Sequence, residues 1–315
     1  GLNYALKTKY WICLFFVAGM TINKQRLEIL WGSFWTGLVA GSILASLQYF
    51  EVLTPIREGH LGFGIKHTLI SVYLVLGILT ASFYFRKSGL LKQKLMYVII
   101  IICCIFHLAV LEGRNGYFSF VLLSPVIANN LMYKFSFKNK MLVAIALIAI
   151  LSLSPVVRDQ IDHTLNQLRQ EKVVTTGEYE RKFDRPYMLH AAWDLFLAHP
   201  IKGAGTGSLK YYTEKSGHPV SHPHNSLLYM AASFGIMGIF SYFLIFGTML
   251  IKSWKYKDNE FGFSILSICA VLFLSGIFET PIINAGTVML FPMGYGLINH
   301  LPEQNRDQSN QTDNN

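Results

Sequence analysis

Long apolar stretches, each close to the length that crosses a lipid bilayer, dominate this chain of 315 residues. One of them reads YVIIIICCIFHLAVL from Tyr97 to Leu111 and is apolar on every side. A helix that crosses the hydrocarbon core needs about 20 mostly apolar residues, and a run that is apolar all round suits such a helix better than a strand. Charged residues make up only 14% of the chain, whereas soluble domains average about 25%. The sequence therefore predicts an all-α fold, a polytopic bundle of transmembrane helices.

Nine apolar runs are candidate spans, and the first and the last are the shortest. They are Tyr10–Ile22, Ile29–Phe50, His67–Phe85, Leu95–Leu111, Tyr117–Tyr133, Met141–Val157, Ser226–Ile251, Phe261–Phe278 and Thr287–Ile298.

The short loops between these runs predict the orientation of the bundle. One set of alternate loops holds twelve basic residues: Lys24, Arg26, Arg86, Lys87, Lys92, Lys94, Lys134, Lys138, Lys140, Lys252, Lys255 and Lys257. The other short loops hold only Arg57, Lys66 and Arg114. Because basic loops stay in the cytoplasm, the first set is predicted to be cytoplasmic. The net charge of +9 is then a topology signal, and no nucleic-acid partner is expected.

This orientation divides the chain into four predicted parts. Residues 1–157 hold about six spans, and residues 158–223 form a large loop outside the cytoplasm. Within that loop, Arg158–Lys172 and Arg185–Ala198 have the apolar spacing of amphipathic helices. Residues 224–300 hold about three more spans, and residues 301–315 form a polar cytoplasmic tail that is expected to be disordered.

The sequence predicts no cofactor. The four cysteines, Cys13, Cys103, Cys104 and Cys269, all lie inside apolar runs without metal-ligand spacing. The glycines from Gly203 to Gly207 lack the spacing and the strand context of a dinucleotide fingerprint. They are expected to form a tight turn against the bundle.

Arg114, in the segment EGRNGY, is the first candidate site residue. It lies at the outer end of two consecutive spans, between Gly113 and Gly116. A guanidinium presents fixed planar donors that match a phosphate group. An interfacial anchor that pairs with phospholipid headgroups is the alternative reading.

Arg185, in the segment DRPYMLHAAWDLF, is the second candidate. Pro186 suits the first turn of a helix, so Arg185 is expected at a helix start near the membrane surface. A salt bridge with Asp184 or Asp194 is the alternative.

The segment SHPHNS, immediately before a span, carries the third group of candidates. Three histidines, His218, His222 and His224, crowd together there, but no cysteine or carboxylate falls at zinc-ligand spacing, so we expect no metal. An imidazole exchanges protons near neutral pH, which makes His224 a candidate base. Asn225 is expected to cap the following helix.

Glu279 is a further candidate, near the outer end of the eighth span. A carboxylate at that depth is costly unless it is paired. We therefore expect it to hold one of the arginines in place.

The order of these motifs is distinctive. It runs G-R-x-G at a span, then R-P-x-M-x-x-A-A-W, then H-P-I-x-G-x-G-x-G, then H-P-H-N-S-L-L, and then ASFGIMGIF within a span. Together they resemble the O-antigen ligase family of bacterial inner-membrane proteins, a superfamily that includes O-antigen polymerases and protein O-oligosaccharyltransferases. Family members are expected to have twelve spans with a large periplasmic loop after the ninth. That loop follows the sixth predicted span here, so three further spans are expected upstream.

The resemblance implies a metal-independent, inverting glycosyltransferase. Its donor would be a glycan on undecaprenyl diphosphate, and its acceptor a sugar hydroxyl of lipid A–core. Arg114 and Arg185 would bind the diphosphate, and His224 would be the base. His222, Asn225 and Glu279 would complete the substrate site on the periplasmic side of the inner membrane.

Two other functions stay open. An O-antigen polymerase or protein O-oligosaccharyltransferase would use the same donor with another acceptor. A transporter or membrane scaffold is the alternative from a different class, although transporters usually carry charged or broken segments near mid-bilayer and internal repeats.

Overall fold

A computed structural model describes residues 22–57, 60–170, 185–214, 220–284 and 287–301, without the side chains of 167–170 and 185–186. Every regular element in these ranges is helical, which confirms the predicted all-α class. The elements are α3 (Lys24–Tyr49), α4 (His67–Lys87), α5 (Leu91–Val110), α6 (Arg114–Leu131), α7 (Phe137–Ser152), α8 (Pro155–Gln170), α9 (Arg185–Ala198), α10 (Ser208–Glu214), α11 (Ser226–Trp254), α12 (Glu260–Phe278), η3 (Thr287–Met289) and α13 (Leu290–Ile298).

Five of these helices, α3, α4, α5, α11 and α12, are long and apolar enough to cross a membrane. A sixth span exists if α7 and the start of α8 are counted together, although the two are bent by 87°. The chain is therefore a multi-pass membrane protein. Of the other predicted spans, Tyr10–Ile22 lies almost wholly outside the described residues, α6 forms a helix that is not among these candidates, and Thr287–Ile298 forms a short apolar helix.

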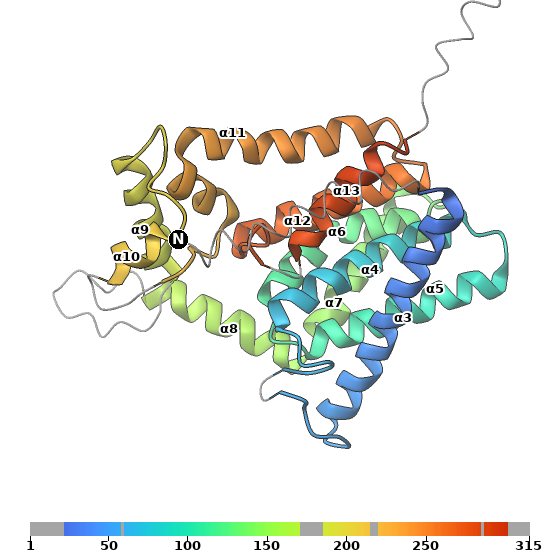
Figure 1. Ribbon diagram of the computed structural model, residues 1–315. Helices are drawn as coiled ribbons and strands as arrows, with labels where there is room; N and C mark the ends of the chain where they lie inside the picture. The colour runs from blue at the N-terminus through green and yellow to red at the C-terminus, as the bar shows by residue number, and fades with distance from the viewer. Residues whose placement is uncertain (1–21, 58–59, 171–184, 215–219, 285–286, 302–315) are drawn as a thin grey trace, which may run out of the picture.

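Helix α4 is the centre of the bundle, and its side chains are buried on all sides. It packs against α3, α5, α6 and α12 (Figure 1). Polar side chains link these helices: the Trp35 indole donates to Thr80 Oγ1 at 3.2 Å, and the Asn130 amide donates to Ser82 Oγ at 3.1 Å. Such bonds between helices are favourable where lipid offers no partner of its own.

The segment between α7 and α11 differs in part from its prediction. The apolar run Met141–Val157 does not continue as one straight helix: α7 ends at Ser152, and α8 begins at Pro155. Proline has no backbone N–H to continue a helix, but its fixed φ suits the first turn of a new one. Helix α9 has the predicted bounds Arg185–Ala198, whereas α10 was not predicted.

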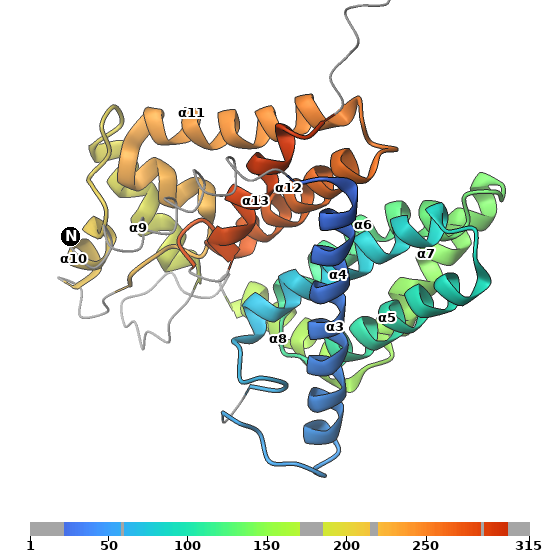
Figure 2. The same ribbon diagram turned by 45° about the vertical axis from the view of Figure 1, so that its right-hand side comes forward.

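Helix α11 is broken at Gly235, where φ is +63° and ψ is −147°. The glycine turn after α9 packs into this break, as the sequence predicted in outline. Ala204 N–H donates to Ala232 C=O at 2.8 Å, and Ile236 N–H donates to Pro200 C=O at 2.8 Å. Figures 1 and 2 both show α9 beside the N-terminal half of α11.

Glycine is required on both sides of this contact. A Cβ on Gly203 would lie 2.3 Å from the backbone of Phe234, and one on Gly235 would lie 2.5 Å from the carbonyl oxygen of Ile201. Both glycines also have positive φ, which L side chains rarely adopt. The two glycines therefore fix the turn and the first half of α11 to each other.

Candidate functional site

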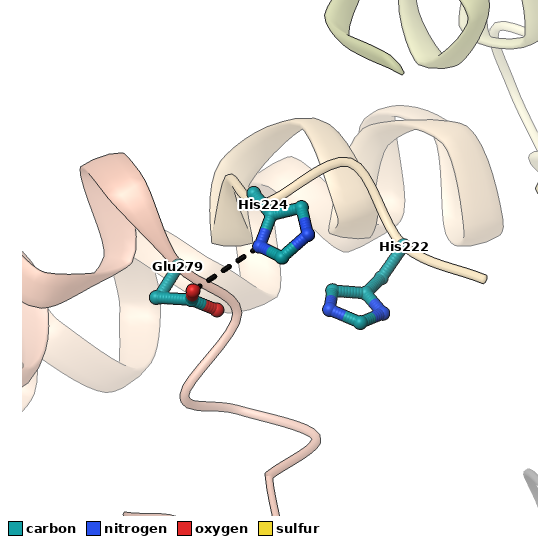
Figure 3. A group of neighbouring side chains, drawn as sticks. All are labelled: His222, His224 and Glu279. Atoms are coloured by element: carbon teal, nitrogen blue, oxygen red, sulfur yellow. Dashed lines mark hydrogen bonds and ion pairs between the residues drawn. The ribbon is translucent and has the colours of Figure 1, made fainter. Parts of the chain in front are cut away.

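His224 and Glu279 meet at the junction of α11 and α12, although 55 residues separate them in the sequence (Figure 3). His224 Nδ1 lies 3.2 Å from Glu279 Oε1, within the range of a hydrogen bond or ion pair. Their side chains are 29% and 15% exposed, respectively. The pair is thus partly shielded from water but still open to a substrate.

The backbone at the start of α11 sets the position of His224. His224 has a φ of +50°, one of two positive values among the described non-glycine residues. Histidine tolerates this left-handed conformation better than most residues, but it is still uncommon. Asn225 follows as the predicted cap, and its Oδ1 accepts from Leu228 N–H at 2.9 Å.

Asn225 also joins the two helices that carry the pair. Its Nδ2 donates to the carbonyl oxygen of Ile277 in α12 at 3.1 Å. Ser226 Oγ donates to the carbonyl oxygen of Glu279 at 3.4 Å. These bonds hold the end of α12 against the start of α11, so the His224–Glu279 distance is fixed on both sides.

His222 lies beside this pair, and its ring centroid is 4.5 Å from that of His224. Ser221 Oγ lies 2.8 Å from His222 Nδ1. One ligand atom each from His222, His224 and Glu279 lie within 4.8 Å of one another, so the three form a possible metal-binding group. This group could not be predicted from the sequence, because Glu279 lies at the end of α12, far from the two histidines along the chain.

Arg114 begins α6 and lines a pocket of about 240 Å³. The pocket is lined by His67, Thr68, Glu112, Arg114, Asn115, Gln160 and His163, all of them polar or charged. Arg114 is half-buried, and its Nη1 donates to Thr164 Oγ1 of α8 at 3.1 Å. The pocket is thus built from the starts of α4 and α6 and the middle of α8.

Contacts among α4, α6 and α12 connect this pocket with the His224–Glu279 pair. The Asn115 amide, in the pocket wall, donates to Ser275 Oγ at 2.7 Å. Ser275 C=O in turn accepts from Glu279 N–H at 2.9 Å. His67 lies near enough to interact electrostatically with both Glu112 and Glu279. The pocket and the pair therefore lie at one end of the bundle, called here the site end.

Sequence reasoning did not identify several residues of this pocket. His67 was predicted only as the first residue of a span, and Gln160 and His163 only as part of the helix Arg158–Lys172. A spacing of three places Gln160 and His163 on one helix face, which was an available signal. Gly116 lets α6 approach α4, because a Cβ there would lie 2.5 Å from that of Ser71.

Two predicted elements of the site are placed only in part. Arg185 begins α9 as expected, but its side chain lies outside the described atoms, as does the whole of His218. The expected arginine partner of Glu279 stays a prediction. Among the described residues, this carboxylate contacts His224.

The fold and the site together define a multi-pass membrane protein with a cluster of histidine, carboxylate and arginine groups at one end of its helices. The model of the O-antigen ligase family matches residues 99–243, a range that includes Arg114, His222 and His224. A Rickettsia typhi protein named "Putative polysaccharide ligase" is 24% identical over 258 residues. The resemblance to the O-antigen ligase family is thus confirmed.

The match to this relative is partial. It covers 76% of this chain and 58% of the Rickettsia protein, so the chain spans little more than half of that relative's length.

Proposed function

We propose that this protein is a glycosyltransferase that ligates a glycan from undecaprenyl diphosphate to a sugar hydroxyl of lipid A–core. The observation that carries the proposal is the His224–Glu279 pair beside the Arg114 pocket, at one end of a membrane bundle. The family match and the named polysaccharide ligase support a glycan-ligating reaction.

In this proposal His224 is the general base. When Nδ1 carries the ring proton, it donates to Glu279 Oε1 at 3.2 Å and leaves Nε2 free to accept a proton. The carboxylate orients the imidazole and stabilises the imidazolium that forms. This is the role that a third group plays behind a base in other enzymes.

The proposed reaction forms one bond and breaks one. The acceptor oxygen attacks the anomeric carbon of the donor while its proton passes to Nε2 of His224. The bond from that carbon to the diphosphate oxygen breaks, and undecaprenyl diphosphate leaves with the electron pair. Attack from the side opposite the leaving group inverts the anomeric carbon.

The diphosphate is proposed to bind in the Arg114 pocket. Arg114 and Arg185 would stabilise the negative charge that develops on the leaving group. The side chains of His67, Gln160 and His163 add hydrogen-bonding groups to the same pocket. Because guanidinium groups supply the positive charge, we expect the transfer to survive EDTA.

The distribution of basic loops favours a site end outside the cytoplasm, so we propose an inner-membrane enzyme with a periplasmic site. Its substrates would both be lipid-linked glycans that reach the site from the bilayer.

Competition among acceptors tests this proposal. The full-length gene product is expressed and then reconstituted with an undecaprenyl-diphosphate glycan. Lipid A–core, a second lipid-linked glycan and a serine-containing peptide are then offered in equal amounts. Transfer to lipid A–core supports the proposal, whereas preferred transfer to the second glycan or to the peptide would assign the protein to the polymerases or to the O-oligosaccharyltransferases. No transfer to any acceptor would overturn a glycosyltransferase assignment.

A further inference from the structure

We infer that His222, His224 and Glu279 also form a binding site for a transition-metal dication of the zinc class, and that this cation inhibits the enzyme. The cation-binding part stands on the geometry alone. The inhibition rests on the proposed function, because it follows from the assignment of His224 as the base.

Three donors are already gathered close to the spacing that a metal requires. One ligand atom from each residue lies within 4.8 Å of the others, and His224 Nδ1 and Glu279 Oε1 are 3.2 Å apart. Tetrahedral zinc with bonds of about 2.0–2.2 Å places neighbouring ligand atoms a little over 3 Å apart. Small rotations of these side chains therefore bring all three donors onto one ion.

The local structure arranges these donors without help from a metal. His222 and His224 stand two residues apart around Pro223, and the left-handed backbone of His224 turns its ring toward Glu279 (Figure 3). Asn225 and Ser226 bond to the end of α12 and so fix the carboxylate against the histidines. The fold thus orders the ligands before a metal binds, so little further conformational entropy is lost on binding. This favours metal affinity.

His222 has the kind of supporting partner that metal-bound histidines require. Its Nδ1 lies 2.8 Å from Ser221 Oγ, so a metal ion would bind to His222 through Nε2. A hydrogen bond to the second ring nitrogen fixes the tautomer and the ring direction of a metal-ligating histidine.

Two imidazoles and one carboxylate indicate the class of ion. Imidazole suits zinc, copper, nickel and cobalt, while magnesium prefers oxygen ligands only. Two histidines and one glutamate are also the ligand set of open zinc sites in which water takes the fourth position. The partial exposure of His224 and Glu279, 29% and 15%, leaves room for that water.

A bound cation would stop the proposed reaction by a direct route. A cation bound to Nε2 of His224 would occupy the lone pair that accepts the proton of the acceptor hydroxyl. A cation bound to Nδ1 would replace the contact with Glu279. Removal of the cation restores both. Added zinc should therefore abolish glycan transfer, and EDTA should restore it.

Zinc binding to the intact protein in detergent tests the site without any glycan. After EDTA treatment and dialysis, the wild type is titrated with ZnCl₂ in a calorimeter, with MgCl₂ as the comparison ion. We expect one equivalent of zinc to bind and no magnesium. The same protein should give the visible absorption of four-coordinate cobalt when CoCl₂ is added.

Three variants locate the site. His222→Gln and Glu279→Gln each remove one ligand with little change in volume, and His190→Gln changes an exposed histidine of α9 as the matched control. Loss of an outer-shell partner alone lowers metal affinity about 10- to 100-fold, so loss of a ligand should lower it at least as much. The control should bind zinc like the wild type.

The outcomes separate this inference from the proposed function. Stoichiometric zinc that is weakened in both ligand variants supports the site, even if the protein transfers no glycan. Absence of zinc binding in the wild type, or equal binding in all variants, overturns the site and leaves the transferase proposal standing. Transfer that persists with the zinc site filled overturns the inhibition.

Discussion

The two ends of the helix bundle carry charged groups of different kinds. At the end opposite the site, called here the basic end, Lys24 pairs with Glu260 at 2.9 Å and Arg86 with Asp258 at 2.8 Å. One partner of each pair is largely open to solvent, because Lys24 is 61% exposed and Asp258 is 67% exposed. At the site end, the paired His224 and Glu279 are mostly covered.

We propose that this difference separates charge that orients the protein in the membrane from charge that takes part in catalysis. Exposed pairs are screened by water and salt and contribute about 0–1 kcal/mol each. The basic residues at this end are instead proposed to set the orientation of the chain in the membrane. A covered histidine–carboxylate pair keeps a fixed geometry and a stronger interaction, which a general base needs. Variants at both ends test whether the two ends differ in this way.

His224→Ala is expected to have the largest effect. Loss of a general base typically costs about 10²- to 10⁴-fold in rate, so glycan transfer should fall to background. Transfer is measured on reconstituted protein and as O-antigen on lipopolysaccharide gels. Membrane insertion, checked by fractionation, should be unchanged because the side chain is not in the apolar core. Normal O-antigen in this variant would exclude His224 as the base.

Glu279→Gln extends the same test. The amide keeps a hydrogen-bond acceptor for His224 Nδ1 at the 3.2 Å position but loses the charge that stabilises an imidazolium. A smaller loss than in His224→Ala is therefore expected.

Arg114→Lys is expected to have the next largest effect. Lysine keeps the charge but loses the planar fork that binds two phosphate oxygens at once. Removal of one donor to a developing negative charge costs about 10²- to 10³-fold, so a charge-conserving change should cost about tenfold or more. A similar loss in the rate of transfer is expected for Arg185→Lys.

Arg86→Lys is the matched control for this comparison, because Arg86 pairs with Asp258 at the basic end. Transfer should stay near the wild-type rate in this variant. Full activity in both Arg114→Lys and Arg185→Lys would show that these arginines anchor the chain to headgroups.

Gly235→Ala tests the contact that positions the first half of α11. The added Cβ would lie 2.5 Å from the carbonyl oxygens of Pro200 and Ile201, at a φ of +63°. Overpacking and backbone strain of this kind cost about 1–3 kcal/mol each. We expect a lower thermal midpoint in detergent and faster amide exchange in α9. Gly247→Ala, in the same helix with no atom within 4 Å of the new Cβ, should change neither.

Much of the fold could be predicted from local pattern. The bounds of α9, the cap at Asn225 and five of the apolar helices depend on residues that are close in the sequence. These are properties of periodicity and capping, so no tertiary information is needed.

Other features could not be predicted, because they depend on how distant segments meet. The run Met141–Val157 is apolar throughout, so its sequence does not predict the bend between α7 and α8. The bend accompanies the packing of α8 against Arg114, which is a tertiary contact. The pairing of His224 with Glu279 joins two helices, and the pocket joins His67 with His163 across the bundle. Their shared position at the site end could be predicted from the topology, but their contacts could not.

Asp258→Asn is expected to have the smallest effect. The Arg86–Asp258 bond is 2.8 Å long, but the carboxylate is 67% exposed, so water replaces most of its contribution. The loss in stability should stay below about 1 kcal/mol, and the rate of transfer should not change. Both are measured beside the wild type, by thermal unfolding in detergent and by the reconstituted transfer assay. A large fall in transfer would mean that the basic end is coupled to the chemistry, and the contrast between the two ends would then fail. A small loss of stability with normal transfer would instead confine the chemistry to the end where His224, Glu279 and Arg114 lie.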